Sequence, residues 1–245
     1  MHEKNIIIKT KDGNLDCRVF INKSINAPTI IFYMDAPGIR KELRDMCRRI
    51  LKNGYNVILP NLFYRVGTER NYPFDQKNYK KLKEELDIMI STMNNTTNNM
   101  IINDTKYIID YIEYNFNNSN KVGIVGYCMS GRFVVSCGAY YADKISAIAS
   151  FYGVNILTEK NDSPHLLANK IKGDLYLAFA EKDVWVPKET LKKIKKTFYK
   201  YKNCTIEIYP RTSHGFAFPE RDTFMKEAAE KHWKKLINLF DINLK

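Results

Sequence analysis

The sequence predicts an α/β protein with a mostly parallel central sheet that helices cover on both faces. Short apolar runs alternate along the chain with segments whose apolar residues recur at helical spacing. The chain has 245 residues, of which 44% are hydrophobic, so it is long enough to bury one large core. No internal repeat is visible. We therefore expect residues 1–245 to form a single domain.

Strands are expected wherever a short run of apolar or alternating residues is bounded by turn residues. In chain order these runs are residues 6–9, 16–21, 29–33, 55–59, 122–125, 147–152, 174–180 and 204–209. The first two flank the polar turn 11–14 and predict a hairpin. The later runs are separated by helical segments, which predicts parallel strands joined by crossovers.

Helices are expected where apolar side chains recur every three or four positions. These segments are residues 39–53, 104–115, 191–198 and 223–240. The Asn- and Thr-rich stretch 94–99 is instead expected to be a mobile loop between two helices, either the edge of a lid or an insertion.

The net charge is strongly positive, because 39 basic residues outnumber 27 acidic ones and give +12. Lysine and asparagine are abundant throughout the chain, and no helix-turn-helix, zinc-finger or stacking-sheet motif accompanies them. A solvated basic surface explains this composition better than a nucleic-acid partner does. A basic protein that binds nucleic acid is the least favoured functional hypothesis, and it predicts binding that weakens steeply with salt.

The cysteines and the N-terminus indicate the compartment. The five cysteines, at positions 17, 47, 128, 137 and 204, form no C-x-x-C cluster, which argues against a disulfide framework and a structural zinc site. The N-terminus lacks the apolar stretch of a signal peptide, and no segment approaches the roughly eighteen apolar residues that span a membrane. We expect a soluble cytoplasmic protein with no membrane partner and no metal.

The hexapeptide at 126–131, Gly-Tyr-Cys-Met-Ser-Gly, directly follows the strand expected at 122–125 and has the form of a nucleophile elbow. In such a strand-to-helix turn the central residue is exposed on strained backbone, and small neighbours let strand and helix pass closely. Gly126, Ser130 and Gly131 meet that demand. Because the elbow usually carries serine, two interpretations of Cys128 are open: a nucleophile, or a small buried apolar residue.

The partners of such a nucleophile are expected later in the chain, in the order acid and then histidine, each after a strand. Asp183 follows the strand expected at 174–180, just before a proline that can begin a helix. His214 follows the strand expected at 204–209 and precedes a glycine. Three residue types in this order favour a catalytic triad of Cys128, Asp183 and His214.

The chemistry of this triad is coherent. Only the thiolate of a cysteine is a strong nucleophile, so Cys128 needs a helix N-terminus, a nearby imidazolium or both to stabilise that form. The elbow offers the first and His214 the second, while Asp183 orients the imidazole. Attack on an ester or thioester carbonyl produces an oxyanion, for which the backbone N–H groups of Met129 and Ala36 are the expected donors. No cofactor is required.

With these residues the chain resembles the dienelactone hydrolase family of the α/β-hydrolase fold, from about residue 6 to about residue 240. The resemblance is carried by the hexapeptide at 126–131, by Asp183 with the tryptophan and proline that follow it, and by His-Gly-Phe-Ala-Phe at 214–218. The stretch 32–38 also matches, where the family carries an acidic residue and the backbone of an oxyanion hole. The resemblance implies hydrolysis of carboxylic esters or lactones.

The chain departs from the family pattern at two positions. The family's acidic residue is usually glutamate and is thought to hold the resting thiol and to help form the thiolate. The resemblance assigns this thiol-modulating role to Asp35, which is one methylene shorter. Phe218 stands where members that bind an anionic lactone carry arginine. This second departure argues against dienelactone itself as the substrate.

Further side chains are candidates for substrate binding because their loops are expected at the carboxyl ends of strands. They are Tyr64, Arg65, Trp185 and Phe218. Arg132, next to the elbow, is a candidate either to hold a substrate carboxylate or to pair with Asp35. Cys137 is expected to be a packing residue, with a redox pair as the alternative.

The remaining histidines fit no site: His165 is expected at the surface, and no role is assigned to His2 or His232. The sequence therefore predicts a cysteine hydrolase of small esters, lactones or thioesters that acts through an acyl-enzyme. The alternative is a non-catalytic relative that binds a ligand or senses redox state through Cys128.

Overall fold

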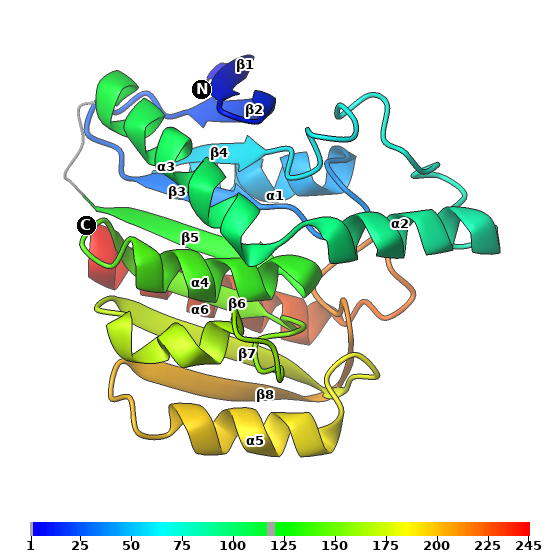
Figure 1. Ribbon diagram of the computed structural model, residues 1–245. Coiled ribbons are helices and arrows are strands. Elements are labelled where there is room, and N and C mark those ends of the chain that lie inside the picture. The colour runs from blue at the N-terminus through cyan, green and yellow to red at the C-terminus, as the bar shows by residue number, and fades with distance from the viewer. Residues whose placement is uncertain (1, 117–120) are drawn as a thin grey trace. The chain divides into compact units, whose positions relative to one another are not determined.

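The computed structural model describes residues 2–116 and 121–245 (Figure 1). The chain forms two compact units, Met1–Ser119 and Asn120–Lys245. Each unit combines strands with helices that cover them.

The first unit contains four strands in the order β1-β2-β4-β3. Their bounds are β1 (His2–Thr10), β2 (Gly13–Ile21), β3 (Thr29–Tyr33) and β4 (Asn56–Pro60). β1 and β2 form an antiparallel hairpin, β2 is also antiparallel to β4, and β3 is parallel to β4. Every residue of β3 and β4 is buried, which explains why both are nearly continuous apolar runs in the sequence.

Three helices accompany these strands: α1 (Lys41–Lys52), α2 (Lys83–Asn95) and α3 (Asn98–Asn115). α1 is the crossover between the parallel strands β3 and β4, and its apolar face packs on β4 and β2. α3 packs on β1. Figure 1 shows α1 and α3 on opposite sides of the strands.

The second unit has four parallel strands in the order β5-β6-β7-β8. They are β5 (Val122–Tyr127), β6 (Ile145–Phe151), β7 (Asp174–Lys182) and β8 (Cys204–Ser213). The helices are α4 (Gly131–Tyr140), α5 (Lys188–Phe198) and α6 (Lys226–Leu244), with the 3₁₀ turns η1 (Cys128–Ser130) and η2 (Pro164–Lys170). α4 and α6 both pack on β5 and β6, and they lie on opposite sides of them (Figure 1).

The mostly parallel strands, with helices on both faces, confirm the fold class that the sequence predicts. All eight expected strands form, and several are longer than expected, as in β8, which continues to Ser213. Since the strands of the second unit are parallel, their carboxyl ends lie at one edge, where ligands of such sheets bind. Among the residues described, no helix combines the length and apolarity needed to cross a membrane.

The expectation of a mobile loop at 94–99 is wrong. α2 ends at Asn95 and α3 begins at Asn98, so the two helices almost abut. The Thr97 hydroxyl accepts a hydrogen bond from the Met100 N–H (3.2 Å) and caps α3, while Thr96 and Asn98 are buried. Polar residues that suggested a loop are in fact the end of one helix and the cap of the next. The sequence placed this stretch between two helices without giving bounds for the first of them, which is α2.

Candidate active site

Cys128 occupies the sharp turn between β5 and α4. Its φ angle is 54°, in the left-handed region that non-glycine residues rarely adopt. The carbonyl of Cys128 accepts a hydrogen bond from the Val154 N–H (3.0 Å), which fixes the turn to the loop after β6. The Cys128 side chain is partly exposed, whereas its neighbours Tyr127 and Met129 are buried. This is the backbone geometry of a nucleophile elbow.

Glycines on both sides of Cys128 make the turn possible. A Cβ atom on Gly126 would lie 2.6 Å from the Ser130 carbonyl oxygen. A Cβ atom on Gly131 would lie 2.2 Å from the Gly153 Cα. Both distances are shorter than real contacts, so strand and helix can approach this closely only with glycine at these positions.

Asp183 and His214 meet at the same edge of the sheet. Asp183 directly follows β7, and His214 directly follows β8, the neighbouring strand. The Nδ1 atom of His214 lies 2.9 Å from Oδ2 of Asp183. The other carboxylate oxygen, Oδ1, accepts a hydrogen bond from the Trp185 N–H (2.9 Å). Both oxygens of the buried Asp183 carboxylate therefore have partners, and the carboxylate holds the imidazole in one orientation.

The surroundings of His214 are largely aromatic. The Tyr152 ring packs edge-on against the imidazole at a centroid distance of 5.0 Å, and the Trp185 ring lies 6.4 Å away. The His214 carbonyl accepts a hydrogen bond from the Thr223 hydroxyl (2.8 Å), and the adjacent Gly215 has a φ of 86°. The hydrogen bond from Thr223 thus holds the backbone of the loop at the histidine itself.

The charge state of His214 depends on Cys128. Burial by itself would lower the pKa of the imidazole, but the Cys128 thiolate and then the Asp183 carboxylate outweigh burial and raise the pKa to about 9. The Nε2 atom is buried and makes no hydrogen bond of ordinary geometry to a described residue, so Cys128 acts on the ring mainly through charge. These contacts favour the charged form of the His214 imidazole.

In the first unit, the loop after β3 carries Asp35 and Ala36. The Asp35 side chain is fully buried and is paired with Arg40 through contacts of 2.6 and 3.2 Å. The Arg40 guanidinium also contacts Glu42 (2.6 Å), and the two carboxylates raise the pKa of Arg40 against the effect of burial. Sequence reasoning did not single out Arg40. The thiol-modulating role of Asp35 stays a prediction.

Tyr64 and Arg65 both bind Asp104 within the first unit. The Arg65 guanidinium contacts both carboxylate oxygens of Asp104 (2.9 Å each) and Oδ2 of Asp12 (2.6 Å). The Tyr64 hydroxyl donates to Asp104 (2.8 Å). These contacts join the segment after β4 to α3 and to the β1–β2 turn, and a role of either side chain in substrate binding stays a prediction.

The three other substrate-binding candidates differ in exposure. Trp185 is 52% exposed beside His214, and its role in substrate binding stays a prediction. Arg132 is nearly buried, with its guanidinium 4.7 Å from the Phe133 ring centroid, and burial lowers its pKa although the charges of Asp162 and Cys128 raise it. Phe218 has no exposed surface and packs on Tyr127. This position makes Phe218 a core residue and does not support the expected contact with substrate.

His232, to which the sequence assigned no role, lies in the core directly behind the elbow. Its Nε2 atom is 2.7 Å from the hydroxyl of Tyr127, the residue before Cys128, and its Nδ1 is 3.1 Å from the Ala229 carbonyl oxygen. His165 is partly exposed and bonds the Ser163 hydroxyl (2.7 Å). Cys137 is fully buried in α4, which supports its expected packing role. Across residues 2–116 and 121–245 no three His, Cys, Asp or Glu residues form a group that could hold a metal.

Comparisons with known proteins identify the family of this chain. The model of the dienelactone hydrolase family matches residues 15–244. A protein of Synechocystis sp., provisionally named carboxymethylenebutenolidase, is 30% identical over 99% of this chain and 98% of its own length. A provisionally named dienelactone hydrolase from Klebsiella pneumoniae superposes with a TM-score of 0.80 at 20% identity, covering 98% of each chain. A dienelactone hydrolase-like promiscuous phosphotriesterase from metagenomic libraries gives 0.75 at 15% identity, covering 99% of each.

Proposed function

The chain belongs to the dienelactone hydrolase family and is an ester or lactone hydrolase, and from this premise we propose that it hydrolyses small esters, lactones or thioesters through an acyl-enzyme on Cys128. The observation that carries the proposal is the Asp183–His214 pair at 2.9 Å, with an imidazole pKa that the Cys128 thiolate helps to raise to about 9. A thiol that merely fills space in the core has no use for an oriented, charged imidazole.

In the acylation step, the Cys128 thiolate attacks the carbonyl carbon and forms a C–S bond. The electron pair of the C=O bond moves to oxygen and produces a tetrahedral oxyanion. When the oxyanion collapses, the bond to the leaving alkoxide or thiolate breaks, and the His214 imidazolium gives its Nε2 proton to that group. Asp183 keeps Nδ1 protonated and the ring oriented throughout.

Backbone N–H groups stabilise the oxyanion in this proposal. The Met129 N–H directly follows the nucleophile, and the Ala36 N–H comes from the loop after β3. Ala36 is 3% exposed, and its N–H donates no hydrogen bond to another described residue. A buried donor without a partner is costly, and such a donor is expected where a ligand atom completes the bond.

Deacylation reverses the roles of the same groups. The neutral imidazole of His214 takes a proton from water, and the resulting hydroxide attacks the thioester carbonyl. The C–S bond then breaks, the carboxylic acid leaves, and the thiolate–imidazolium pair is restored. Trp185, exposed beside His214, is the proposed wall for the substrate.

The test is hydrolysis of short activated esters, thioesters and lactones by wild type and Cys128→Ala, with mass spectrometry of the quenched enzyme. We expect an acyl adduct on Cys128 in wild type, and a loss of turnover on the order of 10⁴-fold in the variant. Cys204→Ala is the matched control, because burial raises the pKa of the Cys204 thiol to about 12 and leaves it unable to act as a thiolate. This variant should keep wild-type turnover.

Undiminished turnover by Cys128→Ala would contradict the covalent mechanism. If neither protein turned over any substrate of the panel, while Cys128 was readily oxidised and reduced again, the redox-sensing alternative would be favoured instead.

A further inference from the structure

The loop between β3 and α1, residues 34–40, carries the proposed oxyanion donor Ala36. It is buried from Met34 to Ile39, and a turn hydrogen bond from the Gly38 N–H to the Asp35 carbonyl (3.0 Å) gives it its shape. A backbone donor is effective only if it is held within a few tenths of an ångström of the position where the oxyanion forms. The side chains that hold this loop therefore determine the position of the Ala36 N–H.

Gln76, on the segment between β4 and α2, binds the loop at two carbonyl oxygens. Its Nε2 donates to the Pro37 carbonyl (2.7 Å) and to the Ile39 carbonyl (3.1 Å). The side-chain amide of Gln76 thus binds the two backbone carbonyls on either side of Gly38, which lie 39 and 37 positions earlier in the chain. Both carbonyls belong to buried residues, so the loss of this donor would be costly.

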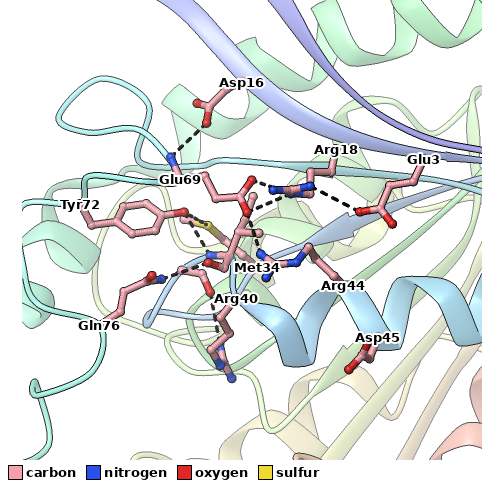
Figure 2. Close-up of polar contacts among 12 residues, drawn as sticks. Glu3, Asp16, Arg18, Met34, Arg40, Arg44, Asp45, Glu69, Tyr72 and Gln76 are labelled. Carbon is pink, nitrogen blue, oxygen red and sulfur yellow. Dashed lines mark hydrogen bonds and ion pairs between the residues drawn. The ribbon is translucent and has the colours of Figure 1, made fainter.

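Tyr72, on the same segment, binds both ends of the loop with one hydroxyl group. The oxygen accepts a hydrogen bond from the Ile39 N–H (3.1 Å), and the O–H points to the Met34 sulfur (3.9 Å). Figure 2 shows Tyr72 and Gln76 approaching the loop side by side, with Met34 beyond them. Tyr72 is 8% exposed, and burial is the main reason that the pKa of its hydroxyl is raised.

Gly38 shows how closely the two side chains approach. Its φ is 83°, and a Cβ atom there would lie 2.7 Å from Cε2 of Tyr72 and 3.0 Å from Nε2 of Gln76. The turn therefore needs glycine for two reasons: the left-handed backbone and the direct contact with both side chains. The loop and the segment that carries Tyr72 and Gln76 are therefore closely packed at Gly38.

The segment itself is anchored at two points. The Glu69 carboxylate contacts Arg18 of β2 (2.7 Å) and Arg44 of α1 (2.8 Å), as Figure 2 shows. The Tyr72 ring stacks on Phe74 at a centroid distance of 5.6 Å and packs edge-on against Phe63. Tyr72 is thus held by its ring as well as by its hydroxyl group.

We propose that Tyr72 and Gln76 are positioning residues for the oxyanion donor: they hold the loop 34–40 and so fix the direction of the Ala36 N–H, the donor that the proposed mechanism requires. This inference rests on the proposed acyl-transfer function. Neither side chain is required to touch the substrate or the thiol. Loss of either should lower kcat, because the donor matters most in the transition state, and should change KM and the reactivity of Cys128 little.

The test compares Gln76→Glu and Tyr72→Phe with Asn71→Asp. Glutamate keeps the shape of Gln76 but cannot donate to two carbonyls, and phenylalanine keeps the Tyr72 ring but loses the hydroxyl. Asn71 is exposed on the same segment, so Asn71→Asp is a matched change of amide to carboxylate. We expect kcat to fall about 10- to 100-fold in Gln76→Glu and about 3- to 10-fold in Tyr72→Phe, less than the loss of a whole donor. Asn71→Asp should stay within about twofold.

A second readout separates positioning from general damage. Iodoacetamide alkylates a thiolate by displacement at a saturated carbon, which produces no oxyanion. Three of the other cysteines, Cys17, Cys47 and Cys137, are buried, and the pKa of the Cys204 thiol is raised to about 12, so alkylation reports on Cys128. The alkylation rate of both variants should match that of wild type.

The inference is overturned if kcat of both variants equals that of Asn71→Asp, even if their melting temperatures fall. It is also overturned if alkylation falls in parallel with kcat, because the elbow would then be disturbed as well. If Gln76→Glu does not fold, Tyr72→Phe decides alone. Turnover that survives Cys128→Ala would instead refute the proposed function, which distinguishes the two failures.

Discussion

Two strand-to-helix turns of this protein, the elbow at 126–131 and the loop at 34–40, are held in their conformations by different kinds of contact. Each follows a buried strand of a parallel pair and precedes a helix. The elbow takes its shape from its own residues: strained backbone at Cys128 and glycines on either side. The loop takes its shape from Tyr72 and Gln76, more than thirty positions away. The first turn is a local structure, and the second depends on tertiary contacts.

The difference indicates how each turn would fail. In the elbow, the limiting contact is between backbones, so little can relax after a substitution. In the loop, the limiting contact is with side chains that can adjust at some loss of alignment. We therefore expect substitutions of the elbow glycines, Gly126 and Gly131, to act mainly on folding, and loop substitutions to act mainly on catalysis.

The largest effect is expected for Gly131→Ala. Its Cβ would lie 2.2 Å from the Gly153 Cα, and neither backbone can move without displacing β6 or α4. We expect the free energy of unfolding to fall by about 3 kcal/mol or more, measured by urea denaturation. Gly138→Ala, in the same helix, is the control. There the new Cβ would lie 2.8 Å from Cγ1 of the Ile148 side chain and meets no backbone atom this closely, so its loss should be smaller. Equal losses would show that the elbow is not limited by its backbone.

The next largest effect concerns the charge held at the elbow. Removing the thiolate in Cys128→Ala should lower the pKa of His214 from about 9 toward its ordinary 6.5, since Cys128 outweighs Asp183 in raising it. NMR titration can follow this, because the chain has only four histidines. A folded-state pKa above the unfolded value means that the contribution of His214 to stability is complete below pH 6.5 and is lost as the pH rises through 9. An unchanged titration in Cys128→Ala would exclude the thiolate–imidazolium pair.

The same contrast explains what the sequence could predict. The elbow residues are contiguous, and the acid and base each follow a strand in the expected order, so Cys128, Asp183 and His214 could be proposed from pattern alone. The structure brings Asp183 and His214 to 2.9 Å. The positioning residues Tyr72 and Gln76 could not be found in this way, because they lie in an irregular segment without strand or helix periodicity.

Two other differences have local physical causes. The polar run around Thr97 was expected to be a loop, although threonine followed by a helical segment is also a helix N-cap signal, and the cap is what the structure contains. Phe218 was expected in a binding pocket from its place in the chain, but the loop after β8 turns its ring into the core beside Tyr127. Position along a chain indicates which loop a residue belongs to, and not which way its side chain points.

Gly38→Ala tests the loop directly and should have an intermediate effect. The new Cβ combines an unfavourable φ of 83° with a contact of 2.7 Å to the Tyr72 ring. We expect a destabilisation of about 1–3 kcal/mol and a fall in kcat at nearly constant KM. Gly13→Ala is matched for backbone strain, since its φ is 139°, but its Cβ would be 3.6 Å from the nearest ring atom. This control should lose stability and keep kcat. A loss of kcat in both would assign the effect to strain alone.

The smallest effect is expected for Glu69→Gln, which weakens the anchor of the segment without touching Tyr72 or Gln76. Arg18 and Arg44 are 21% and 25% exposed at the side chain and Glu69 is 14% exposed, so solvent screens the ion pairs only in part. Glutamine keeps one acceptor oxygen for the guanidinium groups, and we expect a destabilisation of about 1 kcal/mol. Since the Tyr72 ring remains packed on Phe74, kcat should change less than twofold. Urea denaturation and steady-state kinetics measure the two quantities on one sample. A large loss of kcat in Glu69→Gln would mean that the conformation of the loop depends on the ion pairs that anchor the segment to β2 and α1. The packing of Tyr72 on Phe74 would then not be sufficient to hold the loop.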